Sequence, residues 1–424
     1  MIDARMVREQ AGALREGVRR RGSLDAHGPV IDRAERLDRE RRATIQAVEE
    51  RKAARNAASQ EVARKKKAGE NADELMASAR AIGAEIARLE AELEASQGAF
   101  DTILMELPNV TLPEVPEGDA SANVVVSTWG DPRAAGSVKP HWEVAEALGL
   151  LDLPRGAKIS GSGFIVYRAR GAKLQRALMN FLVDLHTREF GYEETQVPLF
   201  VNRASMTGTG QFPKFEDDSY ALRDDALFAI PTSEVPVTNL FRDEILDGAS
   251  LPLALTAFSQ CFRREAGAAG KDTRGLLRLH QFDKVELVRF TAPEDSPAQL
   301  ELLTSHAEQA LQRLGLPHRR LLLAAGDTGF SNAKTYDLET FAPGVGSWLE
   351  VSSCSSYTDF QARRANIRYR PAPGEKPRHV HTLNGSGLGF PRVIATILEH
   401  YQNADGSVTV PEVLRPYFGA DVIR

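Results

Sequence analysis

The stretch "CFRREAGAAGKDTRGLLRLHQFDKVELV", residues 261–288, has two segments of alternating side chains on either side of a glycine-rich loop. Successive residues of a strand face opposite sides of a sheet. This period places Arg263 with Glu265 on one face of the first segment, and Phe282 with Glu286 on one face of the second. The stretch therefore predicts a β-hairpin whose functional face suits a ligand with phosphates, a flat base and an ammonium group. The alternative is a solvated hairpin face with cross-strand ion pairs.

The composition is that of a soluble protein with more than one domain. The chain has 424 residues, of which 42% are hydrophobic and 26% charged, and its formal net charge is -5. This charge argues against coating nucleic acid by bulk attraction but permits a local basic patch. Cys261 and Cys354 lack a CxxC or companion histidine pattern, so we expect neither disulfides nor zinc. With no signal peptide and no apolar run of about 20 residues, the chain is expected to be cytoplasmic and free of membranes.

The sequence changes character near residue 108. Residues 1–108 are predicted to form a helical arm, with turn residues Gly69 and Asn71 between two helix-rich segments. We expect an antiparallel coiled-coil hairpin over about residues 30–107, because the second segment has an apolar stripe at heptad spacing. The stripe consists of Leu75, Ala79, Ile82, Ile86, Leu89, Leu93, Ser96, Phe100, Ile103 and Leu107.

The first helix of the arm ends in a basic run. Between residues 51 and 67, Glu61 is the single acidic residue. Taken alone, such a run is typical of a solvated helix face. The alternative is an electrostatic footprint for the phosphate backbone of a nucleic acid, displayed near the tip of the arm. The basic residues are Arg51, Lys52, Arg55, Arg64, Lys65, Lys66 and Lys67.

Residues 109–138 are rich in Pro, Gly, Asp and Ser and are predicted to be a linker. Residues 139–424 mix helical patterns with short β-branched runs that do not alternate regularly, which predicts an α+β domain. Neither GxGxxG after a strand nor GxxxxGK[ST] is present. A nucleotide would therefore have to be held in another way.

Residues 261–288 resemble motif 2 of the class II aminoacyl-tRNA synthetases, in the form found in the seryl-tRNA synthetase family. The resemblance covers nearly the whole chain, with its passages in the expected order. It implies a catalytic domain built on an antiparallel β-sheet with flanking helices, a tRNA-binding arm and a homodimer formed through motif 1. The other passages are "GAKLQRALMNFLVDLHTREFGYEETQVPLFV" (171–201, motif 1), "SMTGTGQFPKFE" (205–216), "IPTSEVPVTN" (230–239), "KTYDLE" (334–339), "EVSSCS" (350–355), "DFQARRANIRYR" (359–370) and "TLNGSGLGFPRVIATILEHYQNADGSVTVPEVLRPY" (382–417, motif 3).

The resemblance also implies an ATP site. In it, Arg263 and Arg392 are the catalytic residues, and Arg263 bridges the amino-acid carboxylate and the α-phosphate, as a bidentate fork can. Phe282 and Arg392 lie on opposite faces of the adenine. Glu350 and Ser353 hold Mg²⁺ through oxygen ligands. The complete implied set is Arg263, Arg264, Glu265, Arg278, Phe282, Glu350, Val351, Ser352, Ser353 and Arg392.

The implied reaction is activation of L-serine with ATP and transfer of the seryl group to the 3′-terminal ribose of tRNA(Ser), and also of tRNA(Sec). No nucleophilic side chain is needed, because positioning and charge stabilisation are sufficient. A pocket that bonds the serine hydroxyl would reject alanine strongly. The implied serine residues are Thr232, Ser233, Glu234, Arg263, Glu286, Asn384 and Ser386.

Two alternatives remain from the sequence. One is a related enzyme that passes the activated amino acid to a carrier protein or a biosynthetic acceptor, although such an enzyme would not need a long arm that is basic near its tip. The other is a non-enzymatic binding protein built on an inactive synthetase core. Four intact residues argue against it, since an inactive copy has no reason to keep them all: Arg263, Glu265, Glu350 and Arg392.

Overall fold

The computed structural model describes residues 1–266 and 274–424. The chain divides into two compact units, Met1–Arg19 with Ser23–Pro108, and Arg20–Gly22 with Asn109–Arg424. None of the helices in the described ranges has the length and apolar character that a membrane crossing requires.

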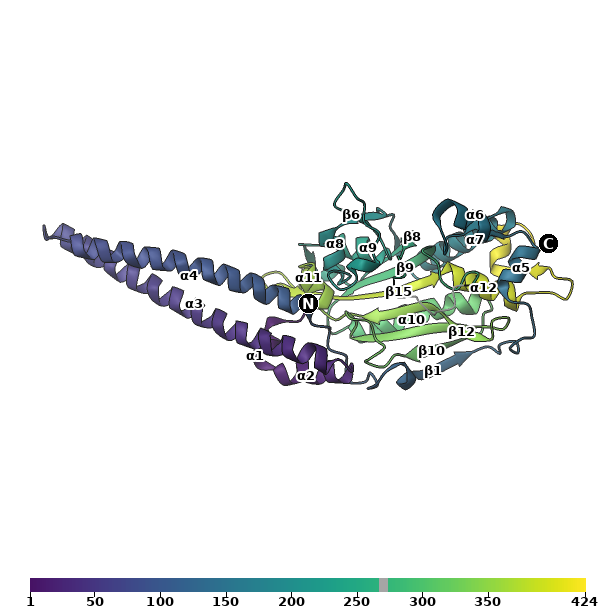
Figure 1. Ribbon diagram of the computed structural model, residues 1–424, viewed down its shortest axis with the longest axis horizontal. Coiled ribbons are helices and arrows are strands. Elements are labelled where there is room, and N and C mark those ends of the chain that lie inside the picture. Colours follow the sequence, from purple (N-terminus) through teal and green to yellow (C-terminus); the bar gives the residue numbers. More distant parts are fainter. Residues whose placement is uncertain (267–273) are drawn as a thin grey trace. The chain divides into compact units, whose positions relative to one another are not determined.

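The first unit is entirely helical in its regular structure. Its long helices α3 and α4 run antiparallel and are joined by a turn in which Gly69 has a φ of 75° (Figure 1). Ile86, Leu89 and Phe100 of the predicted stripe are buried, and the positions between them are mostly exposed. The predicted helical hairpin is therefore confirmed. The helices are α1 (Ala4–Glu9), α2 (Ala11–Arg20), α3 (Leu24–Lys67) and α4 (Asp73–Glu106).

The second unit is built on a large, mostly antiparallel sheet. Its strand order is β1-β10-β11-β12-β15-β9-β8-β4, and only β4 runs parallel to its neighbour, β8. This agrees with the α+β class expected from the sequence. The strands are β1 (Val124–Trp129), β4 (Glu193–Glu194), β8 (Leu253–Phe262), β9 (Gln281–Thr291), β10 (His318–Leu322), β11 (Lys334–Ala342), β12 (Ser347–Ser356) and β15 (His381–Gly389).

A group of helices packs against one face of this sheet, and functional side chains line part of the other face. The alternation predicted for β9 is present, since Val285 and Leu287 belong to the main hydrophobic core while Lys284 and Glu286 line a cavity. The burial of apolar side chains between sheet and helices is the main stabilising contribution to such a layer. The helices that contribute to this core are α7 (Ala169–Asp184), α10 (Ser296–Arg313) and α12 (Phe390–His400).

The segment 109–138, predicted as a linker, contributes strand β1 to the edge of the sheet. Val124 pairs with Leu322, and Trp129 pairs with His318. The run of β-branched residues at 124–126 favours a strand, although turn-forming residues surround it.

Shorter elements complete the second unit and carry several of the polar side chains described below. The short helices are α5 (His141–Ala147), α6 (Leu153–Ser160), α8 (Arg203–Gly208), α9 (Glu234–Asn239), α11 (Phe360–Arg364) and α13 (Arg415–Phe418). The short strands are β2 (Leu151–Asp152), β3 (Val166–Tyr167), β5 (Phe200–Asn202), β6 (Leu227–Ala229), β7 (Ile245–Asp247), β13 (Arg368–Arg370), β14 (Arg378–His379), β16 (Val408–Thr409) and β17 (Val422–Ile423).

Candidate functional site

The predicted hairpin is formed by β8 and β9, with Cys261 paired to Phe282 close to the connection between the two strands. The regular ladder stops at Phe262, so Arg263 and Glu265 lie in the connection rather than on the strand that the alternation predicts. The backbone of Glu265 has a φ of 54°, a left-handed conformation that a continuing strand cannot contain. The glycine-rich part of the connection, residues 267–273, lies outside the described residues.

A cavity of about 550 Å³ opens on the face of the sheet opposite α7, α10 and α12. It brings together side chains from the β8–β9 connection, β9, β12, β15, the start of α12 and the segment before α9. The predicted residues that line it are Thr232, Glu234, Arg263, Glu265, Arg278, Phe282, Glu286, Glu350, Val351, Ser353, Asn384, Ser386 and Arg392.

Three residues of the predicted sets do not line this cavity. Ser233 is buried and donates a 3.5 Å hydrogen bond to the carbonyl oxygen of Ala257. Arg264 is exposed, and its Nη1 donates to the carbonyl oxygen of Asp217 at 3.0 Å. Ser352 points away from Ser353, as successive strand residues do, and donates to the carbonyl oxygen of Ser386 at 2.6 Å.

One end of the cavity is rich in guanidinium groups. Arg278 forms an ion pair with Glu265. The guanidinium of Arg263 lies over the ring of Phe282, with its Cζ atom 5.1 Å from the ring centroid. These cations and the aromatic plane offer contacts suited to phosphate oxygens and to a flat base.

Arg392 reaches the same end of the cavity from the first turn of α12. Its Nε donates to the carbonyl oxygen of Leu277 at 3.1 Å, and its Nη1 donates to the carbonyl oxygen of Glu350 at 2.9 Å. Pro391 occupies the first turn of the helix, where a missing N–H costs no intrahelical hydrogen bond. These two contacts fix the direction of the Arg392 guanidinium.

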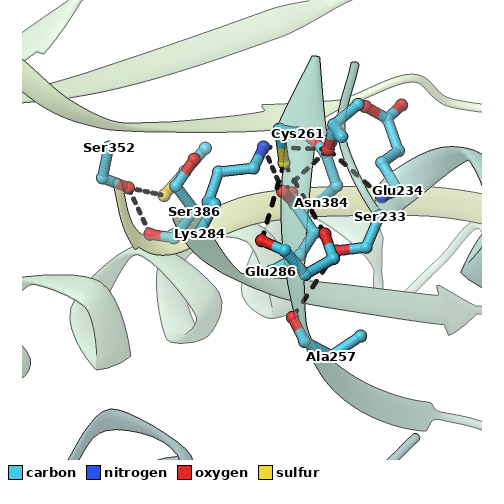
Figure 2. A network of polar contacts seen from close by, with 12 residues as sticks. Ser233, Glu234, Ala257, Cys261, Lys284, Glu286, Ser352, Asn384 and Ser386 are labelled. Carbon is cyan, nitrogen blue, oxygen red and sulfur yellow. Dashed lines mark hydrogen bonds and ion pairs between the residues drawn. The ribbon is translucent and has the colours of Figure 1, made fainter. Parts of the chain in front are cut away.

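The other end of the cavity contains two buried carboxylates, Glu234 and Glu286, shown with their neighbours in Figure 2. Burial, together with the negative charge of Glu286, raises the pKa of Glu234 to about 7. The ammonium of Lys284 forms an ion pair with Glu286. A cationic end and a carboxylate end in one cavity suit a ligand that carries both phosphates and an ammonium group.

Two polar residues that the sequence did not single out support this carboxylate end. Tyr357 donates from its hydroxyl to Oδ1 of Asn384 at 2.9 Å, and Gln361 donates from Nε2 to Oε1 of Glu234 at 2.6 Å. Burial raises the pKa of Tyr357 well above its usual value, so its hydroxyl remains a donor. No sequence signal assigned these contacts, because the partners come from distant segments.

Glu350 and Ser353 of β12 offer oxygen atoms of the kind that Mg²⁺ prefers. Nearby, Asp337 has a buried Oδ1 without a hydrogen-bond partner among the described residues. Burial and the negative charge of Glu350 raise the pKa of Asp337 well above its usual value. The oxygen ligands and the surplus of carboxylates therefore fit a divalent cation.

The basic run of the helical hairpin is largely exposed. Arg51 and Lys52 form ion pairs with Glu85 and Glu90 of α4, at 3.1 and 2.7 Å. Arg64 pairs with Glu61 at 2.5 Å. The charge of Lys65 also acts on Glu61, whereas in residues 1–266 and 274–424 no acidic partner is found for Arg55, Lys66 and Lys67.

Two family models match the chain. The model described as the seryl-tRNA synthetase N-terminal domain matches residues 1–111. The model described as the tRNA synthetase class II core domain (G, H, P, S and T) matches residues 214–401.

Curated relatives and solved structures are similar over the full length of the chain. A serine--tRNA ligase of Gemmatimonas aurantiaca is 66% identical over 100% of both chains, and one of Bacillus subtilis is 50% identical over 99% of this chain and 98% of its own. The crystal structure of seryl-tRNA synthetase from Pyrococcus horikoshii complexed with ATP is 38% identical, with a TM-score of 0.96, and the match covers 100% of this chain and 99% of that chain. The cytoplasmic serine-tRNA ligase from Naegleria fowleri in complex with AMP is 27% identical, with a TM-score of 0.90 and the same coverage.

Proposed function

Because the chain belongs to the seryl-tRNA synthetase family, we propose that serine and ATP react in its 550 Å³ cavity. The protein is an ATP-dependent ligase that activates L-serine to seryl-adenylate and transfers the seryl group to the 3′-terminal ribose of tRNA(Ser). The observation that carries the site assignment is the convergence of Arg263, Arg278 and Arg392 at one end of a cavity whose other end contains two buried carboxylates.

ATP occupies the guanidinium end in this proposal. Phe282 stacks on one face of the adenine and Arg392 covers the other face, while Glu265 lies beside the base. Arg278 binds the terminal phosphates. Both Arg392 and Arg278 are already held by contacts within the protein, and preorganised donors stabilise developing charge without first having to reorient.

Serine occupies the carboxylate end. Glu234 pairs with its ammonium group, since this buried acid is bonded by the neutral amide of Gln361 and has a raised pKa that a cation would lower again. Glu286, Asn384 and Ser386 complete the pocket. Arg263 of the guanidinium end binds the serine carboxylate and the α-phosphate together.

The positions proposed for serine and ATP place the serine carboxylate next to the α-phosphate, where the two can react. A carboxylate oxygen of serine forms a bond to the α-phosphorus, and the bond between that phosphorus and the pyrophosphate oxygen breaks. Arg263 stabilises the negative charge that develops on the α-phosphate. In the second step the terminal ribose hydroxyl of tRNA bonds to the seryl carbonyl carbon, and AMP leaves.

Mg²⁺, when bound, would be held by Glu350 and Ser353 and would supply positive charge against the phosphate oxygens. The fit rests on their oxygen ligands and on Oδ1 of Asp337 nearby, which has no hydrogen-bond partner in the part of the chain that the structure describes.

The helical hairpin is the proposed tRNA contact. Its exposed cations without acidic partners in the described chain, Arg55, Lys66 and Lys67 among them, suit a phosphate backbone. We extend the proposal to tRNA(Sec), which the family resemblance implies as a second acceptor.

We also propose a homodimer, on the resemblance of residues 171–201 to motif 1, and a cytoplasmic location. Cys261 and Cys354 are both free and buried, which fits a reducing compartment. Burial raises the pKa of Cys354 to about 12, so this thiol stays neutral.

Exchange of pyrophosphate into ATP in Arg263→Ala tests the site assignment. Arg223 is a matched control, because it is 90% exposed and pairs only with its neighbour Asp224 in the described structure. We expect Arg263→Ala to lose serine-dependent exchange by at least about 100-fold, as the loss of one transition-state donor does, and Arg223→Ala to retain it. Exchange near the wild-type rate in a folded Arg263→Ala variant would show that this arginine does not contact the reacting groups.

A further inference from the structure

Three polar side chains form a closed group at the carboxylate end of the cavity. Lys284 and Glu286 are two residues apart on β9 and therefore project from the same face. Thr232 comes from the segment before α9. The ammonium of Lys284 contacts Glu286 and also donates to Oγ1 of Thr232 at 2.8 Å, as Figure 2 shows in part.

The hydroxyl of Thr232 has no hydrogen-bonding capacity left. It donates its one proton to Oε2 of Glu286 at 2.9 Å. It accepts from Nζ of Lys284 at 2.8 Å and from the backbone N–H of Glu234 at 3.1 Å. A hydroxyl has one donor and two acceptor positions, so all three are occupied. Thr232 therefore orients Glu286 and does not bind serine through its hydroxyl.

The two oxygens of Glu286 differ as a result. Oε2 receives both Lys284 and the Thr232 hydroxyl. Oε1 is buried and has no hydrogen-bond partner among the described residues, although Glu286 lines the cavity. A buried acceptor without a donor is unfavourable, so this oxygen provides a reason for a ligand donor to bind.

The charge of Lys284 decides which donor suits Oε1. The nearby Glu234 is bonded by a neutral amide, whereas Glu286 already has a full positive charge beside it. A substrate ammonium at Oε1 would be repelled by the Lys284 ammonium. A neutral hydroxyl would not be, and a charged acceptor makes its hydrogen bond strong.

We propose that Lys284 is a positioning residue for serine recognition, which fixes Oε2 of Glu286 and leaves Oε1 to accept a hydrogen bond from the serine hydroxyl. This inference rests on the proposed serine site. It assigns different tasks to the two carboxylates, with Glu286 binding the hydroxyl and Glu234 the ammonium group. Lys284 acts on the serine hydroxyl through Glu286 in this proposal.

The test is Lys284→Met, which keeps most of the length of the side chain and removes its charge. The Michaelis constant for serine in pyrophosphate exchange should rise by about 10- to 100-fold, because a hydrogen bond to a charged group is lost or misdirected. The constant for ATP should change by less than about twofold. Alanine has the carboxylate and ammonium but no hydroxyl, so its inhibition constant should also change by less than about twofold.

Lys334→Met is the matched control. Lys334 is also largely buried, with a side chain 13% exposed, and it pairs with Glu114 at 3.3 Å outside the cavity. Lys334→Met should leave the Michaelis constants for serine and ATP and the inhibition constant of alanine unchanged. Lys284→Gln is a second variant for the case in which methionine prevents folding. We again expect a raised Michaelis constant for serine and an unchanged inhibition constant of alanine.

The outcomes separate this inference from the proposed function. If the Michaelis constants for serine and ATP and the inhibition constant of alanine all rose by the same factor, Lys284 would have a general structural role and the inference would be overturned. Unchanged serine kinetics in Lys284→Met would also overturn it, while leaving the proposed function in place. If the wild-type protein lacked serine-dependent exchange, the proposed function itself would fail.

Discussion

The raised pKa of Glu234 leads to a pH dependence of serine capture. Burial and the charge of Glu286 raise this pKa to about 7, so the carboxyl group retains its proton to a higher pH than an exposed glutamate does. The protonated form has no charge with which to pair the substrate ammonium. Capture of serine should therefore weaken as the pH falls through 7 and reach its full value above it.

The magnitude follows from the titration. With a pKa of about 7, the ionised fraction of Glu234 is about 0.1 at pH 6 and about 0.9 at pH 8. We therefore expect kcat/KM for serine to rise about tenfold between these values. The pH dependence of kcat/KM reports the pKa values of groups in the enzyme before serine binds, so kcat/KM is the quantity to measure. The assay is serine-dependent pyrophosphate exchange at saturating ATP and Mg²⁺.

Two variants isolate the responsible carboxyl group. Glu234→Gln cannot titrate, so its lower kcat/KM should be flat over this range. Asp283 is the control, because burial raises its pKa to about 6 but it bonds Gln175 and does not line the cavity. Asp283→Asn should keep the tenfold rise. A flat wild-type profile, or an unchanged rise in Glu234→Gln, would refute the assignment of the ammonium to Glu234.

Three further predictions concern the arm, the cation and the core. Deletion of residues 30–105 should abolish charging of tRNA while sparing pyrophosphate exchange, and equal charging by the shortened protein would contradict the role of the hairpin. Glu350→Gln should raise the Mg²⁺ concentration needed for half-maximal exchange by about 10-fold or more, because a contact to a charged group is lost. The KM for serine should stay unchanged. Leu178→Ala, in a fully buried position of α7, should lower the free energy of unfolding in urea by about 2–5 kcal/mol, and a loss below about 1 kcal/mol would show that the core can close around the site.

Regular periodicity explains why much of the fold could be predicted. The heptad stripe of α4 and the alternation of β9 are local patterns. The structure buries Val285 and Leu287 of β9 and half of the stripe, namely Ile86, Leu89, Phe100, Ile103 and Leu107, whereas the other stripe residues are half-buried. The end of β8 could not be found in this way. Its alternation continues in the sequence to Glu265, but the left-handed backbone at that residue ends the strand.

Many of the candidate site residues came from the resemblance to motifs, and the cavity brings most of them together. A match to a contiguous motif does not show which of two neighbouring strand residues faces the cavity. Ser352 was therefore predicted together with Ser353, although its hydroxyl points away from the cavity and bonds the carbonyl oxygen of Ser386. The contact between Gln361 and Glu234 could not be predicted from the sequence, for a different reason. Gln361 and Glu234 are 127 residues apart in the chain, and only the tertiary fold brings them into contact.

Amino-acid-dependent exchange of pyrophosphate into ATP, followed by transfer to total tRNA in the same preparation, tests the central claim most directly. Across all the standard amino acids, exchange should depend on serine, and the serine should then be found on tRNA. Exchange without transfer to tRNA, or no exchange with serine, would contradict the account.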